Sequence, residues 1–146
     1  MEFDKLLVLL MIIFTIGIFV VDFYPRENVC FGNDCFWVDV AETQNERQKG
    51  LMGVSSLGGK EGMLFVFPET GNYSFWMKDT LIELDIIWLN SDREVVYIQE
   101  SAKPCLVGEC EFYISDLESK YVLEVNGGKM KELGLGIGDR INELPR

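Results

Sequence analysis

The sequence contains no histidine among its 146 residues, and this absence removes most familiar catalytic machinery. Hydrolases with a Ser-His-Asp or Cys-His arrangement need an imidazole as general base, and common zinc, iron and copper sites use imidazole ligands. The chain also lacks a G-x-x-x-x-G-K-[ST] loop and a G-x-G-x-x-G loop after a strand, the usual cradles for nucleotide phosphates. These classes of activity are therefore excluded in their usual forms.

Basic residues are scarce as well. The chain has 13 Lys and Arg against 24 Asp and Glu, for a formal net charge of −11. The basic side chains form no stripe or cluster that would neutralise several phosphates, so we expect no nucleic-acid partner. The acidic excess favours solubility and repulsion from anionic lipid head groups.

Charge is missing altogether from residues 6–21, which are large and apolar apart from Thr15 and Gly17. As a helix this run would cover about 24 Å, and Phe23 and Tyr24 would anchor it at the interface of a hydrocarbon layer about 30 Å thick. No small-residue cleavage site follows it and no polar face interrupts it, so we prefer a retained anchor to a cleaved signal peptide or a buried core helix. The predicted organisation is a short tail at residues 1–5, a transmembrane anchor at 6–24, a linker with the first cysteine pair at 25–35, and a globular domain at 36–146.

The four cysteines fall into two pairs with four residues between partners, Cys30 with Cys35 and Cys105 with Cys110. Each intervening segment contains turn-forming residues, so each pair can close a local disulfide. A four-thiolate zinc site, unpaired thiols or another connectivity are the alternatives. We prefer two disulfides, because a domain exported by its own anchor lies in an oxidising compartment. The prediction is a single-pass membrane protein with its domain on the extracytoplasmic side.

Short apolar runs separated by glycine, proline and asparagine predict a mainly β domain. The predicted strands are residues 36–41, 63–67 (ended by Pro68), 73–77, 81–89, 95–98 and 121–125, with a hairpin loop at 90–94. A capping-box pattern from Thr43 to Glu46 predicts a short helix that stops at Gly53, and residues 129–133 predict a second. We expect a compact sandwich or barrel-like sheet with one or two short helices, preceded by a single transmembrane helix.

A series of short motifs runs through this region in one order. They are ET at 42–43, ER at 46–47, GLM at 50–52, GMLF at 62–65, FWMKDT at 75–80, LDI at 84–86, PC at 104–105, YVLEV at 121–125 and GD at 138–139. In this order the chain resembles the family known as domain of unknown function 192, or uncharacterised protein family 0127, over nearly everything after Cys35. The resemblance implies a mainly β domain with little helix, often behind a signal or membrane anchor, and no established activity. Glu83 departs from the proline usual before Leu-Asp in that family, so the start of this strand is where we expect a difference.

The FWMKDT run is the most specific of these motifs and supplies the predicted binding face. In a regular strand Trp76 and Lys78 share one side. An indole plane beside an ammonium group, with Asp79 and Thr80 at the strand end, suits a sugar or an acidic group held by stacking and charged hydrogen bonds. The alternative is plain sheet architecture, with Trp76 in the core, Lys78 in solvent and the Asp-Thr pair capping a turn.

Asp85 lies within an apolar run and is the acid that we expect to be buried and paired. We expect Arg47 to be its partner, in an ion pair that ties the short helix to the sheet. The alternative is catalysis, in which Asp79 and Asp85 would form the carboxylate pair of a glycoside-type hydrolase. Glu46 is assigned to the helix cap.

Three methionines suggest one further alternative, copper(I) bound by thioethers, but core packing is the preferred interpretation. They are Met52, Met63 and Met77. The sequence as a whole predicts a membrane-anchored extracytoplasmic domain that binds an unidentified ligand or protein partner without a metal or cofactor. The candidate residues are Arg47, Trp76, Lys78, Asp79, Thr80 and Asp85.

Overall fold

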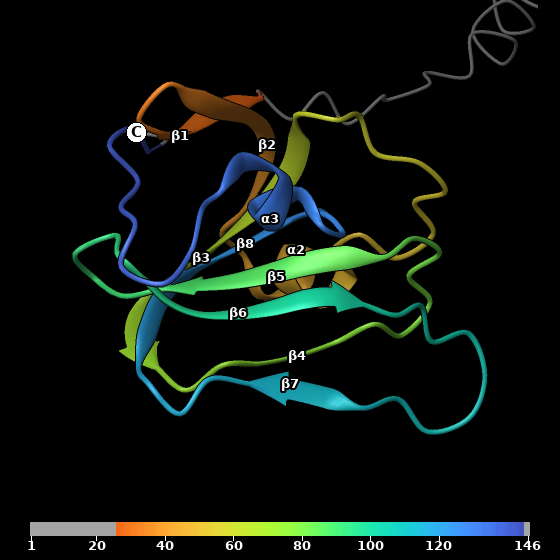
Figure 1. Cartoon of the computed structure of the whole chain (residues 1–146). Coiled ribbons are helices and arrows are strands. Elements are labelled where there is room, and N and C mark those ends of the chain that lie inside the picture. The colour runs from red at the N-terminus through yellow and green to blue at the C-terminus, as the bar shows by residue number, and fades with distance from the viewer. Residues whose placement is uncertain (1–25, 145–146) are drawn as a thin grey trace, which may run out of the picture.

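The described part of the chain, residues 26–144, forms eight strands and two short helices in this computed structural model (Figure 1). The elements are β1 Glu27–Phe31, β2 Asp34–Ala41, α2 Gln44–Lys49, β3 Glu61–Gly71, β4 Ser74–Trp76, β5 Leu84–Leu89, β6 Val95–Ala102, β7 Phe112–Ile114, β8 Ser119–Asn126 and α3 Lys129–Leu133. The predicted anchor at residues 6–24 lies outside the described residues. Within residues 26–144, no helix has the length and apolar character needed to cross a bilayer.

Six of the strands form one open sheet in the order β1-β2-β3-β8-β5-β6, and β4 pairs with β7 in a separate ribbon. Only β2 and β3 run parallel; the other described neighbours are antiparallel. A parallel pair cannot be joined by a tight hairpin, and the connection through residues 42–60 contains α2. The mainly β prediction is confirmed, but the sheets do not close into a barrel.

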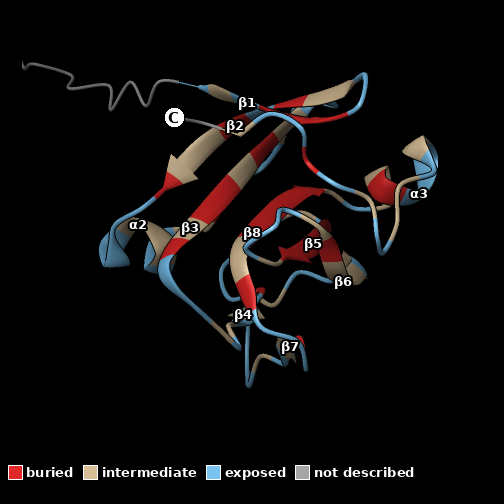
Figure 2. Ribbon diagram, turned by 90° about the vertical axis from the view of Figure 1, so that its left-hand side faces the viewer, coloured by how far each residue is buried: buried red, intermediate tan, exposed pale blue. Residues whose placement is uncertain are grey.

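The six-stranded sheet has an apolar layer on each face, with α2 and α3 on opposite sides of it (Figure 2). Leu123 and Val125 of β8 belong to one cluster, together with Met130 of α3. Val122 of the same strand belongs to the other cluster, together with Met77. Because both faces are covered, every residue of β5 is buried, as in a continuous apolar strand.

The ribbon of β4 and β7 packs on the second of these faces. Phe75 of β4 meets Trp88 of β5 edge to face, with 5.7 Å between the ring centroids. The indole N–H of Trp88 donates a hydrogen bond of 2.8 Å to the carbonyl oxygen of Tyr73. An aromatic contact and a partly buried hydrogen bond therefore hold the ribbon against the sheet.

All six predicted strands are present, with differences at their ends. Pro68 does not end β3, which continues to Gly71; the register with β8 shifts between Val66 and Gly71, so this proline lies where no regular ladder hydrogen bond is required. The strand predicted from residue 81 begins at Leu84. The short strands β1 and β7 were not predicted, and β1 falls in the segment predicted as a linker.

Both predicted disulfides form, so the cysteines supply no thiolates for zinc. Cys30 and Cys35 face each other across the β1–β2 hairpin. Cys105 and Cys110 close a loop ahead of β7, with their Cα atoms 5.8 Å apart. Spacing alone was sufficient here, because each bridge is local.

The two predicted helices are also present. Gly50, with φ of 46°, ends α2 directly after Lys49, three residues before the predicted stop at Gly53. A glycine is favoured where the chain leaves a helix with a positive φ, because it has no Cβ to clash there. The first glycine after the helix, not the second, therefore ends it.

The carboxylate of Asp85 is fully buried and holds α3 against the sheet. Its Oδ1 accepts hydrogen bonds of 2.8 Å from the backbone N–H groups of Ser101 and Gly128, and its Oδ2 accepts one of 2.9 Å from Met130. The predicted ion pair with Arg47 is therefore wrong. Side chains alternate along β5, so Asp85 points to the face that carries α3, whereas Arg47 lies over Phe67 on the other face.

Replacing Asp85 with Ala is expected to lower the free energy of unfolding by about 3 kcal/mol, because three backbone N–H groups, one buried and two partly buried, lose their acceptor. Urea unfolding of the oxidised protein measures this change. Asp116→Ala removes an exposed carboxylate of the same size and is expected to stay within about 0.5 kcal/mol of wild type. Equal losses in the two variants would contradict the anchoring role of Asp85.

Candidate functional site

Two adjoining cavities separate α2 from β4 and together form what we call the aromatic cleft. The outer cavity has a volume of about 440 Å³, and the inner one about 30 Å³. The outer cavity is lined by Gln44, Arg47, Gln48, Phe67, Tyr73, Ser74, Phe75 and Trp76. The inner cavity shares Arg47, Gln48, Phe75 and Trp76 and adds Lys49, Gly50, Leu51, Met52, Phe65, Lys78, Thr80 and Glu124. The outer volume falls in the range of small-molecule sites.

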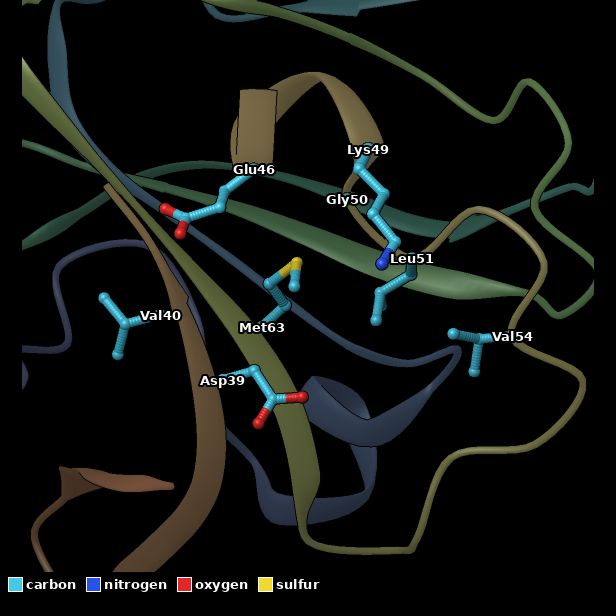
Figure 3. A pocket seen from close by; sticks show the side chains of 8 residues that line it. All are labelled: Asp39, Val40, Glu46, Lys49, Gly50, Leu51, Val54 and Met63. Carbon is cyan, nitrogen blue, oxygen red and sulfur yellow. The ribbon is translucent and has the colours of Figure 1, made fainter. Parts of the chain in front are cut away.

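A third cavity, of about 230 Å³, opens on the other side of α2 (Figure 3). Asp39, Glu46 and Lys49 bring charged groups to its wall, and the side chain of Met63 lies between the two carboxylates in the view. Cavities flank α2 on both sides because no residue of this helix is buried. The helix therefore covers this face of the sheet without filling the space beside it.

The start of α2 is held by the predicted capping box. The carboxylate of Glu46 accepts hydrogen bonds from the backbone N–H groups of Thr43 at 2.8 Å and Glu42 at 2.9 Å. These bonds, that from Thr43 first, lower the pKa of Glu46. The predicted structural role of Glu46 is confirmed.

Arg47 lies at the rim of the outer cavity, above an aromatic wall. Its guanidinium donates to the carbonyl oxygens of Glu42 and Val66, the latter at 3.0 Å, and stands 5.1 Å from the ring centroid of Phe67. Phe67 in turn stacks on Tyr73, with ring planes 11° apart. The wall thus offers flat apolar surface beside a fixed positive charge.

Trp76 and Lys78 lie on one side of their strand, as the alternation predicts. The ammonium of Lys78 is 5.2 Å from the indole centroid, and the indole stacks on Phe112 at 5.2 Å with ring planes 16° apart. Trp76 is 39 % exposed, so it does not form part of the core. Trp76 lines both cavities of the cleft.

The segment after β4 is held in place by the second disulfide loop. The N–H of Cys105 donates to the carbonyl of Met77 at 3.1 Å, and the N–H of Asp79 donates to the carbonyl of Cys105 at 3.0 Å. Asp79 has a positive φ of 54°, and its carbonyl accepts a hydrogen bond of 2.9 Å from Gly53. These contacts place Lys78 and the buried Thr80 at the inner cavity.

Glu124 lines the inner cavity and was not among the predicted site residues. Only 4 % of the residue is exposed, and its carboxyl group has no hydrogen-bond or ion-pair partner among residues 26–144. Burial raises the pKa of this carboxyl to about 8. The sequence did contain a signal, since Glu124 is the one acid in the apolar run YVLEV.

The sheet places Glu124 at this position through its two neighbouring strands. Glu124 stands opposite Met63 of β3 and Ile86 of β5. β3 and β8 approach so closely that a Cβ added to Gly62 would lie 2.5 Å from the carbonyl oxygen of Glu124. A glycine in the GMLF motif is therefore required for the pairing that sets the floor of the cleft.

Four of the six predicted residues line the aromatic cleft, namely Arg47, Trp76, Lys78 and Thr80. Asp85 does not, because it faces α3 across the sheet, and Asp79 takes part in this region through its backbone. The three methionines also separate: Met52 lines the inner cavity, Met63 the cavity of Figure 3, and Met77 is packed in the core. The arrangement suits binding of a flat molecule that carries charge.

Replacing Glu124 with Gln is expected to remove a pH-dependent loss of stability. The folded-state pKa of about 8 lies above the ordinary 4.5, so the contribution of Glu124 is present in full below pH 4.5 and is lost as the pH rises through 8. Each pKa unit corresponds to about 1.4 kcal/mol, and the window from pH 5 to pH 8.5 covers roughly three units of the shift, so wild type is expected to lose about 4 kcal/mol over it relative to Glu124→Gln.

Urea unfolding at pH 5, 6.5 and 8.5 measures this difference. Glu118→Gln alters an exposed acid close to β8 in the sequence and is expected to follow wild type. The lowered pKa values of Glu46 and Glu61 affect stability only at more acidic pH. If the free energy of unfolding changed with pH in the same way for wild type and Glu124→Gln, the burial of an uncharged carboxyl at Glu124 would be contradicted.

Comparison with known proteins places the chain among uncharacterised relatives. Residues 28–143 match the model of the DUF192 family, described as "Uncharacterized ACR". The UPF0127 protein TK1120 of Thermococcus kodakarensis is 32 % identical over 110 residues, which are 74 % of this chain and 65 % of the relative. A UPF0127 protein of Thermococcus sibiricus is 34 % identical over 107 residues, 72 % of this chain and 64 % of its own. The chain thus spans slightly less than two thirds of the length of these curated relatives.

A solved structure shares the fold. The crystal structure of a protein of unknown function from Novosphingobium aromaticivorans superimposes with a TM-score of 0.72 at 34 % identity. The match covers 80 % of this chain and 82 % of that one.

Proposed function

Because this chain belongs to the DUF192 family, a family without an assigned activity, we propose that its domain is a ligand-binding module and that the aromatic cleft is the binding site. The observation that carries the proposal is the meeting of four predicted residues, from α2 and from the segment at β4, with Glu124 of β8 around one cleft. The aromatic walls supply stacking surface, and the cations at the rim supply charged hydrogen-bond donors. Such a combination of apolar lining with a few convergent polar groups is typical of small-molecule sites.

Binding is favoured over the hydrolase alternative by the positions of the two acids that hydrolysis would need. Both carboxylate oxygens of Asp85 accept backbone hydrogen bonds on the opposite face of the sheet from the cleft. A carboxylate held in this way has no access to a substrate in the cleft. No observation therefore favours a glycoside-type reaction of Asp79 with Asp85.

We further propose that the domain is tethered by residues 6–24 and lies on the extracytoplasmic side. The uncharged apolar run at residues 6–21 supports the tether. The two disulfides support the location, because such bonds persist in oxidising compartments.

Replacing Trp76 with Ala is expected to weaken ligand binding. The probes are four single-ring compounds, benzoate, phenyl phosphate, benzyl alcohol and benzylamine, titrated into the full-length protein in detergent micelles and followed by ligand-observed NMR. At least one probe is expected to bind, and Trp76→Ala is expected to raise its Kd about three- to tenfold, the range of an aromatic contact of about 0.5–1.5 kcal/mol. Trp37→Ala is the matched control, since Trp37 is a half-exposed tryptophan outside the cleft. Equal effects of the two substitutions, or no binding of any probe, would refute the proposed site.

The intact mass of the protein extracted from its own membranes without reductant tests the proposed location. A denatured mass lower than that of the reduced chain by four hydrogens, with residues 1–21 retained, is expected for two disulfides and an uncleaved anchor. Four free thiols would place the domain in a reducing compartment, and a shortened chain would show a cleaved signal peptide. A native mass greater than the denatured mass would show that the protein carries a bound ligand from the cell.

A further inference from the structure

We propose that Glu124 is a ligand-binding residue and that the cleft takes a small oxyanion joined to a flat apolar ring, with a carboxylate or phosphate oxygen hydrogen-bonded to the Glu124 carboxyl. This inference rests on the proposed binding function of the cleft and names the chemical class of the ligand. It is carried by the position of Glu124, a 4 % exposed residue that lines the inner cavity without a hydrogen-bond partner among residues 26–144, by the size of that cavity and by the sign of the charges around it.

The carboxyl of Glu124 forms no hydrogen bond or ion pair within the described residues that would account for its burial. Polar groups buried in proteins are nearly always hydrogen-bonded, because an unpaired one loses its hydration without compensation. Asp85 on the opposite face of the same sheet follows this rule, with three backbone donors. Glu124 lines a cavity and its carboxyl forms no hydrogen bond within residues 26–144. No fully enclosed side-chain oxygen of these residues lacks a partner, so the Glu124 oxygens open onto the cavity, where an occupant can bond to them.

The inner cavity has room for one small polar group at this carboxyl. Its volume of about 30 Å³ exceeds the roughly 10–15 Å³ that one water requires. The adjoining outer cavity of about 440 Å³ has space for a ring against Tyr73 and Phe75. A ligand with a terminal oxygen and a flat body matches both parts of the cleft.

The charges around the inner cavity select an anion. Arg47 and Lys78 line it, Lys49 contributes to its wall while its ammonium lies at the third cavity, and Glu124 is the one acid in its lining. Lys49 and Lys78 form no salt bridge with a described residue. The chain as a whole carries a formal charge of −11, whereas the lining of this cleft has a net positive charge. The cleft therefore raises the local concentration of anions.

The protonation state of Glu124 makes the binding depend on pH. Desolvation raises the pKa of this carboxyl to about 8, so at neutral pH it is uncharged and can donate a hydrogen bond to an anionic oxygen. Arg47, Lys49 and Lys78 line the same cavity but make no charge contact that lowers this pKa, while β3 and β5 place Met63 and Ile86 opposite Glu124 in the sheet. Above pH 8 the carboxylate would repel the oxyanion, so affinity is expected to fall as pH rises.

Benzoate is the probe for this pH dependence, because its own charge is constant above pH 6. Ligand-observed NMR on the full-length protein in micelles, from pH 6.5 to pH 9, gives its Kd. We expect benzoate and phenyl phosphate to bind at pH 6.5, and the Kd of benzoate to rise about tenfold between pH 7 and pH 9. The tighter of the two anions identifies the preferred headgroup. Benzylamine binding that strengthens with pH would overturn the proposal, because it would show that ionised Glu124 binds a cation.

Glu124→Gln keeps a hydrogen-bond donor but removes the titration, so the Kd of benzoate is expected to vary by less than about twofold between pH 7 and pH 9. The matched control Glu118→Gln is expected to retain the tenfold change. Lys78→Ala, on the surface, is expected to weaken benzoate binding at every pH and to retain the pH dependence, which tests the site even if Glu124→Gln fails to fold.

The outcomes separate this inference from the function on which it rests. Benzoate binding that needs Trp76 but shows no pH dependence in wild type would overturn the role of Glu124 and leave the cleft as the binding site. Binding of none of the probes, or binding indifferent to Trp76→Ala, would overturn both.

Discussion

The position of β8 between β3 and β5 is the constraint on which the rest of the structure depends. Its register is set by alternation, with Leu123 and Val125 packed in one apolar cluster and Val122 in the other. A slip by one residue would exchange the faces and place Glu124 among the side chains beneath α3. Close contact with β3 at Gly62 supports the same register. Glu124 therefore lines the cleft because β8 pairs with strands that are distant from it in the sequence.

The sheet buries one acid on each face, and the two differ in whether backbone N–H groups bind the carboxyl. Asp85 receives three backbone N–H groups and secures α3, so its burial is compensated and structural. Glu124 receives none and lines a cavity, and its pKa is raised to about 8 by desolvation. An acid in a cleft whose pKa is raised by desolvation is a candidate functional residue. The disulfide loop that begins at Cys105 also shapes the cleft that Glu124 lines, since its backbone hydrogen bonds position Lys78 there.

Local patterns predicted local structure well. The capping box at Thr43 and the helix before Gly134 both form, and six apolar runs became strands. The two cysteine pairs close over short loops, so their pairing required no knowledge of the fold. Two strands were missed because one contains Cys30, in a segment interpreted as a linker, and the other has only three residues. Both are strands only because they pair with another strand, and a short stretch of sequence does not contain that information.

The absence of histidine and the charge of −11 are properties of the sequence by itself, as are the capped helix and the alternation that puts Trp76 beside Lys78. Only the tertiary structure decided which of the candidate residues meet. It separated Asp85 from Arg47 by the thickness of a sheet and brought in Glu124. The physical reason is that the face to which a strand residue points is a local property, whereas its neighbour on that face depends on strand order and on the crossover that carries α2.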